Sequence, residues 1–521
     1  MSRPFHVRAL LGLAAAGTLL ASVGVSPAKA AGAPTLKLVA AQAEVTITRR
    51  GAYAVPLSVG VFTTAINGPF EIHANRADYD SPIVLTQWRD GQQIATLPDG
   101  TADGWNGMAN FFDIKVKNDQ GVTRLDTTQT FCPSTYGVQR VNDTGPQIPT
   151  FPPYGCGANP FTLGSVAGID EGWGVNAFDP YGGYYYGYNG APITYFQGKD
   201  GHFTVSVAID PQYRDLFGVS TSDGTIQVGV TIVTKKHCNY PCYGPNGPNG
   251  PSGPSEPAAK AGAPGTPSTG VPMISAPDPS TEPDLIPLPA WGMSVSNNRN
   301  GASYLNFGAT VWNDGPAPMV VEGFRRPDTD IMDAYQYFYD RQGNVVGHTS
   351  AGTMQYDPRP GHRHWHFEQF AKYALLDGSG QNPIYSTKEA FCLAPTDPID
   401  LTATGADWMP SSIGLGTACG NQSSIWVRET LDAGWGDTYV QYLAGQSFDI
   451  THLPNGRYFI QVTANPAGVI SETNTANDVT TRRVILKGKP GHRHVAVPLW
   501  HGIDSEGCYY YCRGFGAPAK G

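Results

Sequence analysis

Three histidines stand at every second position in the second half of the chain: His362, His364 and His366. In an extended strand, side chains two residues apart point to the same face, with Cα atoms about 7 Å apart. Neighbouring imidazoles of this set can therefore reach one ion. Imidazole binds copper, zinc and nickel alike, so the spacing predicts a transition-metal site without selecting the metal.

Other interpretations of the histidines remain open. They can be exposed side chains on a polar strand, or they can hold a structural zinc. A zinc hydrolase is less favoured, because no Glu stands as in the H-E-x-x-H motif. His492 and His494 form a second pair, which we expect to be non-ligating because two imidazoles alone rarely fill a site.

The start of the chain resembles an export signal. Two arginines precede an apolar run from Ala9 to Val25, and the small residues of Ala28–Ala30 predict cleavage before Ala31. We therefore expect residues 1–30 to be a signal peptide and the mature protein to be secreted. No later segment is long and apolar enough to predict a membrane span.

Composition indicates the class of fold that must position the histidines. The chain has 521 residues, with 63 Gly, 44 Pro, 26 Tyr and 21 Phe, which favours short strands joined by turns over long helices. A chain of this length is too long for one hydrophobic core, so two or more domains are expected. We predict an all-β protein of two related β-sandwich-type domains with few short helices. The net charge of -9 argues against a nucleic-acid partner.

The cysteines and a Pro/Gly-rich segment divide the chain. Residues 244–282 predict a semi-flexible linker between domains at 31–243 and 283–521, because such a composition cannot bury a core. Four cysteines fall on each side, as expected for disulfides in an exported chain. The expected pairs are Cys132–Cys156, Cys238–Cys242, Cys392–Cys419 and Cys508–Cys512. The Cys-x-x-x-Cys pairs can alternatively bind metal, although no partner pair has the usual spacing.

Sequence patterns recur between the two halves at an offset of about 250 to 270 residues, which indicates an internal duplication. The alternating strand before Asp210-Pro211 resembles the one before Asn465-Pro466, and Gly172-Trp173-Gly174 matches Gly434-Trp435-Gly436. Aligning Phe112 with Phe370 places three non-ligating residues opposite the histidines: Gly104, Asn106 and Met108. We therefore expect chemistry only in the second copy.

The second copy also resembles the catalytic domain of the lysyl oxidase family, copper amine oxidases that build a quinone cofactor from their own side chains. Five ordered segments carry the resemblance: Pro283–Pro287, His362–His366 with the residues to Leu376, Lys388–Leu393, Asp437–Tyr439 with Phe448–Thr451, and Glu472–Asn477. The segment after His366 is one residue shorter than in animal members, and no cysteine lies near the histidines.

This resemblance implies specific roles. His362, His364 and His366 would bind copper, and Lys388 and Tyr439 would join as lysine tyrosylquinone. The implied reaction uses O₂ to convert primary amines, with peptidyl lysine expected, to aldehydes with release of hydrogen peroxide and ammonia. Asp437 is our candidate base, because it stands two residues before Tyr439 and shares its strand face.

The first copy lacks these groups at the matching positions. Thr128 stands at the position of Lys388 and Ala177 at that of Tyr439. We interpret residues 31–243 as a degenerate, non-catalytic copy that binds a wall or matrix polymer or packs against its neighbour. The rival hypothesis for the whole chain is a non-catalytic extracellular binding module with a structural zinc.

Overall fold

The computed structural model describes residues 34–506 apart from several gaps, which are 51–53, 135–137, 154–155, 157–158, 179–193, 236–266, 268–269, 328, 341, 359–362, 369, 387, 389 and 411–414. The predicted signal peptide, most of the predicted linker, and Cys238, Cys242, Cys508 and Cys512 lie outside the described residues. The all-β prediction is confirmed: strands dominate, and the described helices are α1 (Pro211–Phe217) and the short 3₁₀ helix η1 (Pro279–Thr281).

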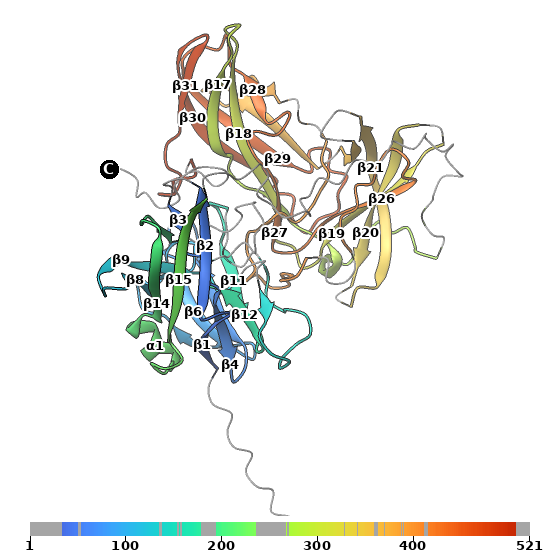
Figure 1. Ribbon diagram of the computed structural model, residues 1–521. Helices are drawn as coiled ribbons and strands as arrows, with labels where there is room; N and C mark the ends of the chain where they lie inside the picture. The colour runs from blue at the N-terminus through green and yellow to red at the C-terminus, as the bar shows by residue number, and fades with distance from the viewer. Residues whose placement is uncertain are drawn as a thin grey trace, which may run out of the picture.

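Residues of the first half form four sheets (Figure 1). In spatial order they are β1 (Thr35–Ala40), β4 (Val61–Ile66), β12 (Trp173–Asn176) and β10 (Gln139–Arg140); β11 (Gly164–Ile169), β5 (Phe70–Asn75), β6 (Val84–Arg89) and β7 (Gln92–Thr96); β2 (Glu44–Arg50), β15 (Thr225–Lys235), β14 (Gly201–Ile209), β8 (Met108–Asn118) and β9 (Thr123–Phe131); and β13 (Tyr195–Phe196) with β3 (Val55–Pro56).

Residues of the second half form three sheets. They are β16 (Leu285–Pro287), β18 (Ser303–Asn313), β27 (Trp435–Tyr439) and β25 (Asp397–Pro398), with β17 (Trp291–Asn297) and β28 (Ser447–Asp449) also pairing with β18; β22 (His364–Phe367), β21 (Val345–Asp357), β20 (Ile331–Tyr339), β19 (Met319–Arg325) and β26 (Trp426–Leu431); and β24 (Ile384–Tyr385), β23 (Ala371–Leu376), β29 (Gly456–Ala464), β30 (Val479–Lys489) and β31 (His492–Ala496).

Three strand orders are shared by the two halves. The order β1-β4-β12-β10 of the first half corresponds to β16-β18-β27-β25 of the second. Likewise, β11-β5-β6 corresponds to β26-β19-β20, and β15-β14-β8-β9 corresponds to β30-β29-β23-β24. Registers agree as well: Gly174 of β12 lies opposite Gln139, and Gly436 of β27 lies opposite Asp397. This agreement in order and register supports the duplication inferred from the sequence.

The strands form where apolar residues alternate, since alternation suits a sheet with one face on a core. β14 and β29 have the same alternation, with every second residue buried from Phe203 to Ile209 and from Tyr458 to Ala464. Each half encloses a hydrophobic core, and both cores are rich in large aromatic side chains.

The structure corrects one detail of the alignment. The N–H of Asp210 donates to the carbonyl of Phe111 (2.9 Å), and the N–H of Asn465 donates to the carbonyl of Phe370 (2.8 Å). Phe111, rather than Phe112, is thus the counterpart of Phe370, because a run of phenylalanines hid the one-residue shift. The residues opposite the three histidines become Asp103, Trp105 and Gly107.

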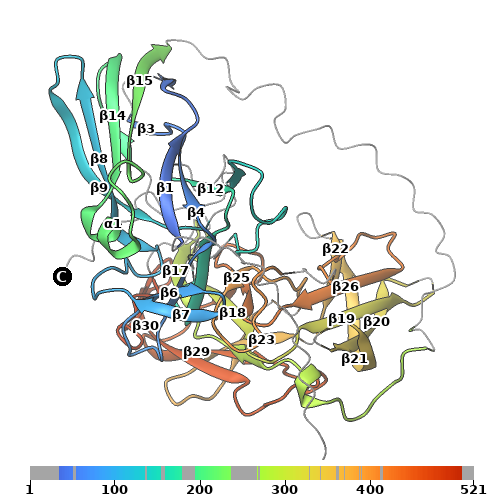
Figure 2. The same cartoon turned by 90° about the horizontal axis from the view of Figure 1, so that it is seen from below.

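The two halves lie against each other in Figure 2. Backbone and aromatic contacts join them. Gly164 at the start of β11 forms a parallel bridge with Asp400 of the second half. Trp408 contacts His73 of the first half edge-on (5.7 Å between ring centroids) and stacks on Phe151 (6.0 Å). Segments far apart in the sequence thereby share one buried interface.

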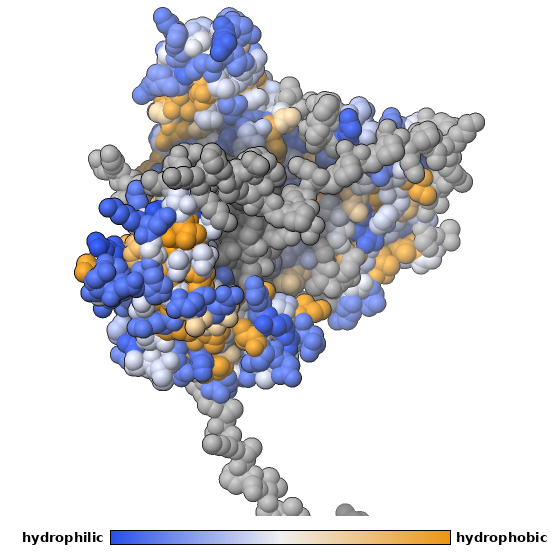
Figure 3. Space-filling view, in the orientation of Figure 1, coloured by the Kyte–Doolittle hydropathy of each residue, from blue (hydrophilic) through white to orange (hydrophobic). Residues whose placement is uncertain are grey.

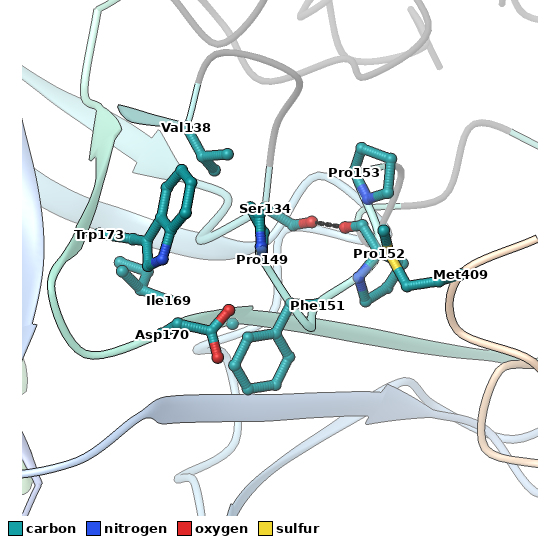
Figure 4. A pocket seen from close by; sticks show the side chains of 11 residues that line it. Ser134, Val138, Pro149, Phe151, Pro152, Pro153, Ile169, Asp170, Trp173 and Met409 are labelled. Carbon is teal, nitrogen blue, oxygen red and sulfur yellow. Dashed lines mark hydrogen bonds between the residues drawn. The ribbon is translucent and has the colours of Figure 1, made fainter. Parts of the chain in front are cut away.

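A small apolar cavity of about 120 Å³ lies beside this interface (Figure 4). The first half supplies most of its lining, including Phe151 and Trp173, and Met409 comes from the second half. The Ser134 hydroxyl donates to the Pro152 carbonyl on its wall.

The end of the predicted linker makes contacts with the second half. The Ile274 N–H donates to the His348 carbonyl (2.9 Å), and the His348 N–H donates to the Pro272 carbonyl (3.0 Å). Residues 272–274, within the predicted linker, therefore lie beside β21.

The surface seen in Figure 3 is mixed, with a hydrophilic tip at the top and separate hydrophobic patches on the first half. Within the part of the chain that the structure describes, no helix has the length and apolar character needed to cross a membrane.

Candidate active site

Two of the three predicted metal ligands lie on β22, which pairs with β21. The Nε2 atoms of His364 and His366 converge to 2.9 Å, and the two rings are nearly perpendicular. His366 is almost fully buried, and its Nδ1 lies 3.8 Å from the Asp357 carboxylate. His362 lies outside the described residues.

This convergence fits a shared ion. Metal–nitrogen bonds of about 2.0–2.1 Å place two ligands ~2.9 Å apart at the right angles of a tetragonal site, and about 3.3 Å apart at tetrahedral angles. The 2.9 Å separation is compatible with two ligands of one ion, and it equally suits a proton shared by the two imidazoles. Among the described residues, no group of three His, Cys, Asp or Glu side chains forms a metal cluster.

Lys388 and Tyr439 lie side by side, although 51 positions separate them. The Lys388 Nζ is 4.2 Å from the centroid of the Tyr439 ring and 5.0 Å from that of Phe391. Lys388 is buried, whereas lysine normally stays in water, so its position has an energetic cost. The fold thus brings together the two side chains that the family resemblance assigns to the cofactor.

The Tyr439 hydroxyl is fixed by the backbone of a cysteine. It accepts from the Cys392 N–H (3.0 Å) and donates to the Cys392 carbonyl (3.1 Å). The neighbouring Phe391 exchanges backbone hydrogen bonds with Phe367, which follows His366. Backbone hydrogen bonds therefore link the histidine strand to the segment after Lys388, and the same segment holds the tyrosine.

Two disulfides have the predicted pairing and lie at matching places in the two halves. Cys392–Cys419 closes the loop that follows the lysine segment, and Cys132–Cys156 closes its counterpart. Both pairings are confirmed.

Buried acids surround the lysine and tyrosine. Burial raises the pKa of Asp437 well above its usual range, while nearby Lys388 opposes the rise and Asp397 adds to it. Burial likewise raises the pKa of Glu429. The Leu393 N–H donates to the Glu429 Oε2 (3.0 Å), and this hydrogen bond opposes the rise. One oxygen of each carboxyl, Asp437 Oδ2 and Glu429 Oε1, has no hydrogen-bond partner among the described residues.

These acids also act on the phenol. Burial, followed by the charges of Asp437 and Glu429, raises the pKa of Tyr439 well above its usual range. The phenol is therefore protonated at neutral pH, consistent with the hydrogen bond that it donates to Cys392.

A cavity of about 310 Å³ joins the two parts of the site. His366 and Lys388 both line it, together with Asp357, Glu368 and the small residues Ala444 and Gly445. A cavity of this size can admit the aliphatic chain of an amine. Polar groups dominate its walls, as a cationic substrate requires.

Sequence reasoning missed Glu429. It stands on β26, whose last three residues are all buried, and it is the one carboxyl on that strand. A signal was present in the pattern, because Glu429 occupies a core-facing position between the buried Val427 and Leu431. The second histidine pair is exposed at both positions, with Arg493 buried between them.

The site and fold define an all-β domain with a buried lysine–tyrosine pair beside converging histidines. Residues 342–495 match the family model described as lysyl oxidase. The chain is 30% identical over 129 residues to lysyl oxidase homolog 4 of Mus musculus and 29% identical over 128 residues to that of Homo sapiens. These alignments cover 25% and 24% of this chain and 15% of each relative. The similarity to the lysyl oxidase family therefore lies in the C-terminal half of the chain, at residues 342–495.

Proposed function

We propose that the C-terminal half is a secreted, copper-dependent amine oxidase acting on primary amines, with peptidyl lysine as the preferred class. The overall reaction balances as R-CH₂-NH₂ + O₂ + H₂O → R-CHO + H₂O₂ + NH₃. The single observation that carries the proposal is the 4.2 Å approach of the Lys388 amine to the Tyr439 ring. Lys388 also lines the cavity that His366 lines.

Copper would be held by His364 and His366, with His362 as the third ligand expected from the sequence. The nearly perpendicular imidazoles and their 2.9 Å approach support this assignment. Bound copper would supply oxidation of the Tyr439 ring by O₂, and the ring joined to Lys388 would supply an electrophilic carbonyl and an acceptor for two electrons.

Asp437 is suited to hold and return a proton. Its carboxyl is buried, and its raised pKa moves it toward the range in which a carboxyl can exchange protons near neutral pH. The backbone N–H and carbonyl of Cys392 orient the phenol of Tyr439. The buried Lys388 amine lies against the ring of that phenol.

The first half would be non-catalytic in this proposal. Thr128 and Ala177 replace the lysine and tyrosine, and Asp103, Trp105 and Gly107 stand opposite the histidines. A wall or matrix polymer remains our proposed partner for this half, alongside its contact with the second half.

Copper-loaded protein tests the proposal through peroxide release with benzylamine and with a lysine peptide, and through its inhibition by phenylhydrazine. Peptide mapping by mass spectrometry should find the Lys388 and Tyr439 peptides joined. Recovery of both peptides unmodified from active protein would refute the cofactor assignment. A zinc-containing protein without peroxide release would favour the non-catalytic binding module.

The chain contains a matched control for the cross-link. The Lys372 Nζ lies 4.0 Å from the centroid of the Tyr385 ring, as close as the proposed cofactor pair, but Tyr385 is exposed. The Lys372 and Tyr385 peptides should be recovered unmodified, which shows that proximity alone does not form the bond.

A further inference from the structure

A chain of buried hydrogen bonds runs from the first half to the strand that carries Asp437 and Tyr439. The Asn159 Nδ2 donates to the Thr310 Oγ1 at 3.0 Å, and this hydroxyl lies 2.8 Å from the Thr438 Oγ1. Thr438 stands between Asp437 and Tyr439 on β27. Asn159 and Thr310 are both essentially inaccessible to solvent, with exposed fractions of 1% and 0%.

The direction of these bonds is fixed by the available donors. The Asn159 Oδ1 accepts from the Phe161 N–H (3.0 Å), so the amide orientation leaves its NH₂ toward Thr310. The Trp291 Nε1 also donates to the Thr310 Oγ1 (3.3 Å). A hydroxyl has two acceptor positions and one proton, so Thr310 must donate its proton to Thr438.

Apolar packing surrounds the same contact. Phe161 of the first half, with partly buried Tyr79 and Leu163, joins a cluster that contains Trp312, Ile399 and Val440. Val440 follows Tyr439 directly. The first half therefore covers the back of β27, which lies between the halves in Figure 1.

A second backbone link supports β27 from its other edge. The Leu163 N–H donates to the Ile399 carbonyl (2.7 Å), and the Leu401 N–H donates to the Gly164 carbonyl (3.0 Å). These residues follow β25, which pairs with β27 through Asp397 and Gly436. Two contacts from the first half thus converge on one strand of the site.

The hydroxyl pair distinguishes the second half from the first. Thr310 lies opposite Thr438 across β18 and β27, and the matching register of β4 and β12 places Phe62 opposite Asn176. The Thr310–Thr438 contact, which Asn159 of the first half joins, is therefore specific to the interface between the halves.

We propose that Asn159 is a positioning residue of the active site, acting through Thr310 and Thr438 to fix β27 so that Asp437 and Tyr439 keep their places beside Lys388. The degenerate half is then part of the catalytic unit. The catalytic readouts rest on the function proposed above, whereas the exchange readout does not.

Full-length variants test this role by hydrogen exchange of β27 and by kinetics. Asn159→Asp, with its carboxyl ionised, keeps the acceptor for Phe161 and removes the donor to Thr310. Asn159→Ser shortens the side chain and removes the same donor without adding a charge, so it serves as the second variant if the first does not fold. Thr310→Val removes the hydroxyl and Thr310→Ser retains it. Thr481→Val makes the same change as Thr310→Val at an exposed position of β30.

We expect Asn159→Asp and Thr310→Val to speed exchange of a peptide covering residues 435–440 about ten-fold, with the β29 peptide unchanged, because one buried hydrogen bond is lost. The same variants should lower kcat about ten-fold with KM within about two-fold. Thr310→Ser and Thr481→Val should match the parent protein.

Equal acceleration of exchange in both peptides would indicate a merely structural role and overturn the proposal, as would unchanged exchange in the Asn159 variant. If the parent protein shows neither peroxide release nor the cross-link, the proposed function fails, but the exchange comparison still decides whether Asn159 positions β27.

Discussion

The two halves share strand order and register but differ in what they bury beside the central strand. In the second half, β27 and its neighbours place Asp437, Glu429 and Lys388 inside the protein. At the register positions that match Asp437 and Glu429, the first half has the apolar Val175 and Ala167, and Thr128, opposite Lys388, is exposed. Buried charges are costly unless they are used or well paired, so the comparison separates residues that the fold needs from residues that chemistry needs.

The largest expected effect comes from the cofactor pair itself. Tyr439→Phe removes the hydroxyl held by Cys392 and the oxygen that oxidation requires, so amine-dependent peroxide should fall by about 10³-fold or more. Initial rates with benzylamine measure this. Tyr385→Phe, at the exposed lysine–tyrosine contact, is the control and should leave the rate unchanged.

Transplanting the pair tests the same comparison from the other side. Thr128→Lys combined with Ala177→Tyr supplies both cofactor precursors to the first half but no imidazoles. In a Tyr439→Phe background, this protein should remain inactive. Recovered activity would show that the histidines are unnecessary, contrary to the proposed role of the metal.

Asp437 should have the next largest effect. Asp437→Asn keeps the size of the side chain but cannot take up a proton, so kcat should fall about 10²- to 10³-fold with little change in KM. The limb of the pH–rate profile assigned to this base should also disappear. Glu429→Gln is the matched change at the other buried acid, and a smaller loss there would separate the two carboxyls. An equal loss at both positions would mean that they act as one coupled pair.

The sequence predicted the fold class and the pairing of the described disulfides because alternation and cysteine spacing are local patterns. The placement of Lys388 beside Tyr439 could be reached only through the family resemblance, since neither residue has a distinguishing local pattern. The contacts that join the halves could not be predicted from the sequence. Asn159 is an ordinary polar residue in the sequence, and only the docked structure shows that it is buried against Thr310.

The shift of one residue in the alignment has the same origin. Phe111 and Phe112 are both fully buried, so composition and hydrophobicity cannot tell which one corresponds to Phe370. The backbone hydrogen bond from Asp210 to Phe111 settles the register. Local patterns identify strands well, whereas register depends on partners distant in the chain.

The two disulfides should stabilise their halves similarly but differ in their effect on activity. Their loops span 24 and 27 residues, for which the loss of unfolded-state entropy gives about 3.5 kcal/mol each. Cys132→Ala with Cys156→Ala should lower stability and leave the yield of the cross-link unchanged. Cys392→Ala with Cys419→Ala should also lower the yield of the cross-link, because the disulfide anchors the backbone of residue 392, whose N–H and carbonyl hold the Tyr439 hydroxyl. Denaturant unfolding and peptide mapping measure the two effects, and equal cross-link yields would contradict the positioning role of Cys392.

The smallest effect concerns a pH-sensitive contact of the first half. The His202 Nδ1 lies 2.7 Å from Asp119 and its Nε2 lies 3.3 Å from Glu44, and these hydrogen bonds raise the pKa of His202 above its ordinary 6.5. The matching residue of the second half is Arg457, which donates to the Gly378 carbonyl (3.3 Å).

Because the folded state binds the His202 proton more tightly than the unfolded state does, this contact stabilises fully below pH 6.5 and its contribution is lost as pH rises through the higher folded pKa. His202→Arg should remove that dependence and raise the melting temperature at pH 8 by about 1 °C, since the contact is exposed. Melting curves at pH 6 and pH 8 measure it. Hydrogen exchange of β14 and β29 assigns the change to one half, and an equal response of both strands would contradict a local contact.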